Sequence, residues 1–329
     1  MSGGGGGGAG ERALQDALKW SLAQQQGGGA GAGAGSGGGS AEDREFLYAA
    51  LQQASRGQEA ELSRALALLR VLPGEGGTLT EDLGQGELEE AQEEALENLI
   101  DIVGEPDFAV GLLQKGGGEV LLSASESPAQ DAGIRALALT AVGTCAQNCP
   151  EAQALLAECR LLERLLALLD RKEAEPASLS AQVLFALGSF VRGNRVATGE
   201  LVRRGGGLRG LAGLPGQTRE LLKPVVDARA RARAFRLAAY LVEHAPGEAA
   251  AAVATGAVTD AALALECEHS GVVDAALAFL SKLAARVAAD PVISEALIPL
   301  REVLAGLEAR RSQTGDDTDE VRGILGILE

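Results

Sequence analysis

The sequence predicts an all-α protein in which helical repeats stack into a solenoid, and three observations support this fold class. Hydrophobic residues make up 46% of the chain and are mainly Leu and Ala, while aromatic residues contribute only 3%. Leu and Ala lose little rotamer freedom in a helix, whereas sheets favour Val, Ile and aromatic side chains. Helical apolar spacing also continues through most of the chain, and a pattern of helices recurs at a nearly constant interval.

Residues 1–40 are expected to form a flexible, glycine-rich segment that contains one short helix. Two glycine tracts, Gly3–Gly10 and Gly27–Gly39, flank an island at Glu11–Gln26 whose leucines recur with helical spacing. The island carries the only tryptophan, Trp20. A helix this short is marginal alone, so we expect it to dock on the solenoid or on a partner.

Residues 41–90 are predicted to form a helical pair and an acidic linker. The pair occupies Glu42–Leu72 with a break near Gly57, and Pro73–Gly86 has the composition of a loop. Eight acidic residues and no basic residue lie between Glu81 and Glu97. We interpret this run as the solvated face of a helix, with near-normal pKa values and no acid–base role.

Residues 91–310 are predicted to form the repeat domain. After a degenerate copy at Ala95–Leu122, four segments share a helix, a short break, a small helix and a further amphipathic helix: Ile134–Asp170, Leu179–Leu214, Arg231–Leu265 and Val272–Leu307. Intervals of 45, 51 and 42 residues separate the aligned positions Gly143, Gly188, Ala239 and Ser281. Armadillo and HEAT units are about 40–47 residues long, so the longest interval requires a long loop near Gly213–Asp227. The pattern predicts an armadillo/HEAT-like right-handed superhelical solenoid, followed by a C-terminal helix at 311–329.

The charge distribution leaves two interpretations open. A net charge of −17 argues against general nucleic-acid binding, which needs a basic surface. Between Arg192 and Arg236, however, the sequence contains eleven Arg or Lys residues and only three acidic residues. This stretch is either a set of solvated helix faces or a basic platform for an acidic protein partner.

No catalytic, metal or membrane motif is recognisable. The two histidines, His244 and His269, are far from any nucleophile motif, and the four cysteines lack both disulfide and zinc spacing. We therefore expect a protein without enzymatic activity or cofactor. No targeting signal or membrane span is visible in the chain, so a cytoplasmic monomer is expected, with a nuclear pool left open.

Three stretches resemble one family, the Fes/Sil-type armadillo nucleotide exchange factors. Leu18–Ala23, with the sequence LKWSLA, is similar to an N-terminal helix of that family. Gly143–Gln153, GTCAQNCPEAQ, resembles its "G-T-x-x-Q-N-N-P-x-x-Q" segment, and Ala186–Asn194, ALGSFVRGN, resembles its "A-L-S-x-L-I-R-N-N" segment. The chain departs from these patterns at Cys149 and Gly193, where the family often has Asn.

The resemblance implies a co-chaperone that holds the nucleotide-binding domain of a heat-shock protein 70 chaperone in the concave armadillo face. Binding would open the nucleotide cleft and promote ADP release. The matched positions that it implicates in partner binding are Gln147, Asn148, Arg192, Asn194 and the helix of Trp20. To these we add Glu105 from the degenerate first copy and Glu243 and His244 from the fourth repeat, on their place in the repeats.

Some of these residues could instead have purely structural roles, and other functions are compatible with the fold. Gln147 and Asn148 are equally suited to bracing the turn between helices through hydrogen bonds to the backbone, and Arg192 to an ordinary surface salt bridge. A generic armadillo adaptor for an extended peptide is the alternative function. A helical regulatory domain of an enzyme is disfavoured because no catalytic constellation is recognisable.

Overall fold

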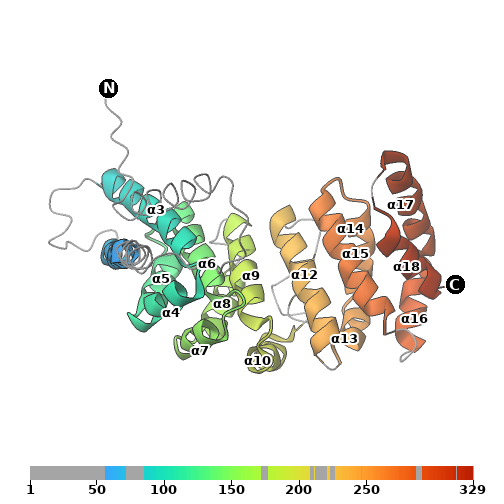
Figure 1. Cartoon of the computed structure of the whole chain (residues 1–329). Helices are drawn as coiled ribbons and strands as arrows, with labels where there is room; N and C mark the ends of the chain where they lie inside the picture. Colours follow the sequence, from blue (N-terminus) through green and yellow to red (C-terminus); the bar gives the residue numbers. More distant parts are fainter. Residues whose placement is uncertain are drawn as a thin grey trace, which may run out of the picture. The chain divides into compact units, whose positions relative to one another are not determined.

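The structure is a computed structural model that describes residues 56–71, 85–171, 177–207, 211, 221–222, 227–245, 247–286, 291–315 and 317–328. All regular structure in these ranges is helical, which confirms the predicted fold class (Figure 1). The predicted glycine-rich segment 1–40 with its Trp20 helix, the loop after Pro73 up to residue 84, and most of the long loop before Asp227 lie outside the described residues.

The chain divides into two compact units, one ending at Ile102 and the other running mainly from Val103 to the C-terminus. In the described part of the chain, no single helix is long and apolar enough to cross a membrane. Two short helices, α13 (Glu248–Ala254) and α14 (Ala257–Leu265), meet that test of length and composition only as a pair, bent by 75°.

In the first unit, residues 56–69 are helical and are followed by α3 (Gln85–Ile102). Leucines at helical spacing on α3, including Leu96 and Leu99, are buried. Gln92 is fully buried on the same helix and donates its Nε2–H to the carbonyl oxygens of Leu68 and Val71, both at 2.9 Å. The amide thus satisfies carbonyls at the end of the preceding helix that have no partner within it.

The acidic residues from Glu87 to Glu97 are part of α3, so the predicted domain boundary between residues 90 and 91 falls inside a helix. Its carboxylates at Glu87, Glu90, Glu93, Glu94 and Glu97 are exposed, as expected for a solvated helix face. The expected loop up to Gly86 is wrong in its last two residues, because α3 begins at Gln85, three residues before its first buried leucine, Leu88.

The second unit consists of helices in a repeating order of one long helix and two shorter ones. In chain order these are α4 (Pro106–Gln114), α5 (Gly117–Glu126), α6 (Ala132–Ala146), α7 (Pro150–Glu158), α8 (Leu161–Asp170), α9 (Ala177–Val191), α10 (Arg195–Gly205), α12 (Ala228–His244), α13, α14, α15 (Ser270–Ala284), α16 (Pro291–Leu297), a 3₁₀ turn (Ile298–Leu300), α17 (Arg301–Thr314) and α18 (Asp319–Leu328).

Successive long helices pack side by side, α6 on α9, α9 on α12 and α12 on α15, and the shorter α18 packs on α15 (Figure 1). Their buried faces carry the largest side chains of the core, among them Phe235 of α12 and Phe279 of α15, whose ring centroids are 5.9 Å apart. Because each helix buries its apolar face against the next, neighbouring repeats form one continuous core.

The predicted register of the repeats is confirmed. Each aligned position stands eleven residues after the first residue of its long helix: Gly143 after Ala132, Gly188 after Ala177, Ala239 after Ala228, and Ser281 after Ser270. The C-terminal boundary differs from the prediction, since α17 runs through residue 311 and the last helix, α18, begins at Asp319. Gly315, with a φ of 79°, ends α17 in the left-handed conformation that glycine adopts readily.

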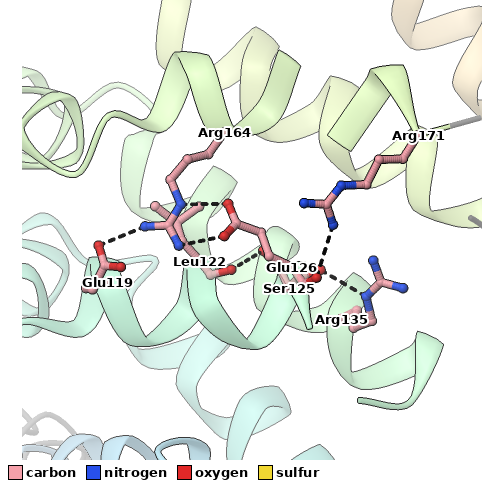
Figure 2. A network of polar contacts seen from close by, with 7 residues as sticks. All are labelled: Glu119, Leu122, Ser125, Glu126, Arg135, Arg164 and Arg171. Carbon is pink, nitrogen blue, oxygen red and sulfur yellow. Dashed lines mark hydrogen bonds and ion pairs between the residues drawn. The ribbon is translucent and has the colours of Figure 1, made fainter. Parts of the chain in front are cut away.

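Arginine side chains brace the end of α5, as Figure 2 shows. Arg164 of α8 binds both oxygens of Glu126, at 2.6 and 2.8 Å, and reaches Glu119 at 2.7 Å. Arg171 donates to the Glu126 carbonyl, and the buried Arg135 of α6 donates to the Ser125 carbonyl at 2.9 Å. Positive groups at a helix C-terminus satisfy its free carbonyls and complement its dipole.

A second buried arginine makes a contact like that of Arg135, three residues after the start of α12. Arg231 stands three residues after Ala228, as Arg135 stands after Ala132, and it is also buried. Its Nε–H donates to the Leu222 carbonyl at 2.8 Å, and its guanidinium reaches the Asp260 carbonyl at 3.0 Å. A buried arginine at this position therefore ties a long helix to the chain that precedes it.

A buried glutamine joins two adjacent repeats. Gln153 of α7 donates its amide N–H groups to the carbonyl oxygens of Ala146, Ser189 and Arg192 at 3.0–3.1 Å. These carbonyls lie at the ends of α6 and α9, where intrahelical partners run out. In the next repeat Thr198 occupies the matching place, four residues after the N-cap, and donates to the carbonyls of Val191 and Asn194.

Gly143 lets α6 approach α9 closely. A Cβ atom at this position would lie 2.5 Å from the ring of Phe185 and 3.1 Å from the Cα atom of Ala186, both in α9. The equivalent Gly188 of α9 has open space where its Cβ would be. Only the first of the two glycines is therefore required by packing.

We expect Gly143→Ala to lower the free energy of unfolding by about 1–3 kcal/mol, because the added methyl group overpacks the α6–α9 contact. Gly188→Ala is the matched control and should raise that free energy by about 0.5–1 kcal/mol, since alanine favours the helix. Urea unfolding followed by circular dichroism measures both changes. Equal effects of the two substitutions would show that Gly143 does not set the distance between the helices.

We expect Gln153→Met to lower the free energy of unfolding by about 2 kcal/mol, because it leaves buried carbonyls without a donor at nearly constant side-chain volume. Gln147→Met, at an exposed glutamine whose side chain makes no hydrogen bond in the described ranges, should change it by less than about 0.5 kcal/mol. The same urea experiment compares the two variants, and equal stabilities would contradict the bridging role.

Candidate protein-binding site

The residues with a family resemblance lie in the turns that follow two long helices. Gln147, Asn148 and Cys149 connect α6 to α7, while Arg192, Gly193 and Asn194 connect α9 to α10. Asn148 and Gly193 both have positive φ angles, 56° and 74°. Asparagine and glycine are the residues that tolerate this left-handed conformation best, so a backbone requirement accounts for both.

Hydrogen bonding separates the four polar residues of these turns. Asn194 caps α10 by accepting a hydrogen bond from the backbone N–H of Ala197 at 3.0 Å, which is a structural role. The side chains of Gln147, Asn148 and Arg192 are exposed and make no hydrogen bond or ion pair with any described residue. Gln153, and neither Gln147 nor Asn148, braces the turn between the helices through hydrogen bonds to the backbone.

Three of the predicted binding residues line one pocket. It has a volume of about 380 Å³ and lies between the end of α6, one face of α9 and the middle of α12. Its lining consists of Gln147, Asn148, Leu184, Phe185, Gly188, Ser189, Arg192, Arg233, Arg236 and Leu237. Leucine and phenylalanine side chains thus alternate with amides and three guanidinium groups, and no carboxylate is in the lining.

Arg233 is held in place within this pocket. Its Nη1 donates to the Ala181 carbonyl at 2.5 Å and to Oε1 of Gln182 at 2.7 Å, and its guanidinium lies 5.1 Å from the centre of the Phe185 ring. Burial lowers the pKa of Arg233, and the nearby charges of Arg229 and Arg236 lower it further. The carboxylate of Asp227 acts in the opposite direction, so the two arginine charges add to the effect of burial and Asp227 partly offsets it.

The basic stretch is recognisable in the sequence, whereas the pocket is not. Arg229, Arg233 and Arg236 lie four and three residues apart, a spacing that places them on one face of α12 and could have been recognised. Their position opposite Gln147 depends on the packing of α6, α9 and α12, which the sequence does not specify residue by residue.

The other predicted binding residues lie outside this pocket. Glu105 is the exposed N-cap residue of α4 and makes no capping hydrogen bond with its side chain. Glu243 accepts a hydrogen bond from Lys282 at 2.8 Å, and this contact lowers the pKa of its carboxyl group. His244 stacks on Tyr240 with ring centroids 4.3 Å apart. Trp20 is not among the described residues.

Asn194 lines a second, larger cavity of about 840 Å³. This cavity lies between α7, α8 and α10, with side chains such as Leu162, Phe190 and Val196 in its wall. Two ion pairs at its edge join Arg204 to Glu163 and to Glu200. Three of the charged groups in its lining are therefore already paired with one another.

In the described ranges, no group of three or more His, Cys, Asp or Glu side chains is arranged to hold a metal ion. All four cysteines are free thiols. Cys145 is fully buried, and burial, with a smaller contribution from Cys149, raises the pKa of its thiol to about 12.

The architecture defines the chain as an armadillo-type α-solenoid. A computationally designed armadillo repeat protein for modular peptide recognition matches 82% of this chain and 100% of its own, with a TM-score of 0.60 and 17% identity. A designed armadillo repeat protein solved in complex with the peptide (KR)4 gives a TM-score of 0.59 at 16% identity, with the same coverage of both chains. These similarities establish the fold.

Among characterised proteins, the chain is similar to Hsp70-binding protein 1. It is 33% identical to the protein of Homo sapiens over 153 residues, which are 46% of this chain and 42% of that protein. The protein of Mus musculus is 34% identical over 156 residues, or 46% of this chain and 42% of its own length. The match thus spans less than half of each relative, and no family model matches the chain.

At mildly alkaline pH, we expect iodoacetamide to alkylate the partly exposed Cys267 of the folded protein and to leave Cys145 unmodified. Since its pKa is raised, Cys145 stays a neutral thiol there, and only the thiolate reacts. Mass spectrometry of tryptic peptides measures both sites, and unfolding in guanidinium should make their labelling equal. Equal labelling in the folded protein would contradict the burial of Cys145.

Proposed function

We propose that this protein is a co-chaperone that binds an Hsp70 chaperone through the face carrying the pocket of Gln147, Asn148 and Arg192. The observation that carries the proposal is that these residues, selected by family resemblance, line one pocket and have no partner among the described residues. Exposed polar groups that no internal contact satisfies are available to a partner without loss of stability. The similarity to Hsp70-binding protein 1 supports the choice of chaperone.

The proposed activity is nucleotide exchange. A protein that binds the open form of the nucleotide-binding domain more tightly than the closed form shifts the domain towards the open form and speeds ADP release. Such a mechanism needs a rigid binding surface and no catalytic group. The buried glutamine and arginine contacts that join successive repeats give this surface its rigidity.

The proposal includes a place and a mode of action. We propose that the protein works in the cytoplasm as a monomer, contacts the nucleotide-binding domain, and has no enzymatic activity or cofactor of its own. A generic armadillo adaptor remains the competing function, and the exchange assay separates the two.

We expect the protein to accelerate the release of fluorescent ADP from a cytosolic Hsp70 by at least about tenfold, equivalent to about 1.4 kcal/mol of the release barrier. Arg192→Glu should weaken binding to the nucleotide-binding domain by about 1–3 kcal/mol, because it reverses a charge at the pocket. Stopped-flow fluorescence measures release, and calorimetry measures affinity.

Arg310→Glu is the matched control for the charge reversal. Arg310 is exposed on α17, and its side chain has no partner in the described ranges. Release and affinity should both be unchanged in this variant. An unaccelerated release by folded wild-type protein would refute the exchange function for that chaperone and favour the adaptor.

A further inference from the structure

We propose that the pocket of Arg192, Arg233 and Arg236 is a receptor for a carboxylate side chain of the partner, presented on an extended acidic segment with an apolar residue beside it. The inference specifies the partner chemistry of the surface in the proposed function. It makes the basic stretch a platform for an acidic partner, the second of the two interpretations of its charge.

The positive charges of the pocket are not neutralised by a carboxylate in its lining. Arg192 and Arg236 are exposed, and neither guanidinium has a hydrogen bond or ion pair with any residue that the structure describes. Arg233 is fixed between them by the Ala181 carbonyl and Gln182, both uncharged partners. A carboxylate entering the pocket would therefore meet three positive groups and displace none of their existing salt bridges.

At the junctions of the next repeats, by contrast, charged side chains of neighbouring helices are paired. Between α12 and α15, Glu243 is paired with Lys282, and between α15 and the last helices Arg311 is paired with Asp274. The charges of these four side chains are therefore neutralised inside the chain. At the junction of α9 and α12 the positive charges lack such a partner, so a ligand of opposite charge is favoured there.

The walls of the pocket contain both apolar and hydrogen-bonding side chains. The partly exposed ring of Phe185 supplies apolar surface, whereas Leu184 and Leu237 line the pocket but are each only 1% exposed. The amides of Gln147 and Asn148 supply hydrogen-bond donors. A volume of about 380 Å³ is at the lower end of the range of ligand pockets, which is about 300–1,000 Å³. The pocket therefore suits a few side chains rather than a whole helix.

A peptide carboxylate fits these walls better than a free phosphate group. Phosphate sites are typically formed by free backbone N–H groups at a helix N-terminus or in a glycine-rich turn. The backbone of Leu184–Ser189 and of Arg233–Leu237 lies in the interior of α9 and α12, where its N–H groups are committed to the helices. In the turns, the backbone N–H groups of Gln147 and Arg192 are bonded to the carbonyls of Thr144 and Gly188. Side chains are therefore the main groups that can hold the anion, and guanidinium groups pair readily with carboxylates in a bidentate manner.

The test uses the full chain and a fluorescein-labelled hexapeptide, Glu-Leu-Glu-Glu-Leu-Glu, with binding measured by fluorescence anisotropy. We expect binding that weakens as salt is added, because screening acts on exposed charges. The double variant Arg192→Ala with Arg236→Ala should bind the peptide at least about tenfold more weakly. Arg310→Ala is the control and should stay within about twofold of the wild type.

Three results would overturn the proposal. The first is equal binding of the peptide in which Gln replaces every Glu, and the second is unchanged affinity of the folded double variant. The third is binding of inorganic phosphate or ADP at the pocket with no binding of the acidic peptide. Circular dichroism establishes that the double variant is folded.

The measurements distinguish a failure of the carboxylate pocket from a failure of the proposed function. Peptide binding that requires both arginines, without binding to Hsp70, would remove the chaperone and retain the carboxylate pocket. Binding to the Hsp70 nucleotide-binding domain that is unchanged in the double variant would retain the chaperone and remove the pocket.

Discussion

The candidate site depends on the amide group of one buried side chain. Gln153 donates to carbonyls at the ends of α6 and α9, and one of its acceptors is the carbonyl of Arg192 itself. Ala146, another acceptor, immediately precedes Gln147. The same hydrogen bonds that join two repeats therefore fix the backbone from which two of the binding side chains project. The three hydrogen bonds of Gln153 thus stabilise the junction of the repeats and also position Gln147 and Arg192, whose own side chains make no hydrogen bond with a described residue.

Charge is distributed unevenly over the long helices. The arginines that are deeply buried, Arg135 and Arg231, neutralise helix ends and tie adjacent segments together. The exposed Lys282 and the partly exposed Arg311 are paired with acidic residues of neighbouring helices. Arg192 and Arg236 have neither role among the described residues, which is the strongest physical reason to assign them to a partner.

Much of the fold could be predicted because it depends on periodic spacing. The repeat register follows from an apolar stripe and a small residue at one helical position, and Gly143, Gly188, Ala239 and Ser281 all occupy that position. The start of α3 was missed because its acidic residues suggested a linker, although buried positions at Leu88, Gln92, Leu96 and Leu99 repeat with helical spacing. Charge on one face of a helix hides the periodicity of the other.

The site was only partly predictable. Gln147, Asn148 and Arg192 were identified by resemblance, and the structure brings them together in one pocket. Asn194 was also identified, but its side chain caps α10, and a motif cannot tell a capping residue from a binding residue. Arg233 and Arg236 were visible only as part of a basic stretch. Their approach to Gln147 is a property of three packed helices and not of any one segment.

Phe185 has two neighbours of different kinds, and this limits how the protein can be modified. One side of its ring lies against Gly143, where it fills the space between two repeats, and its face lies under the guanidinium of Arg233. Redesign of the pocket for another ligand can change Arg192 or Arg236 freely, because both are exposed and uncommitted in the described structure. At Phe185, however, any smaller side chain would loosen the packing of the repeats and the wall of the pocket together, so selection for new specificity at that position would also be selection against the folded solenoid.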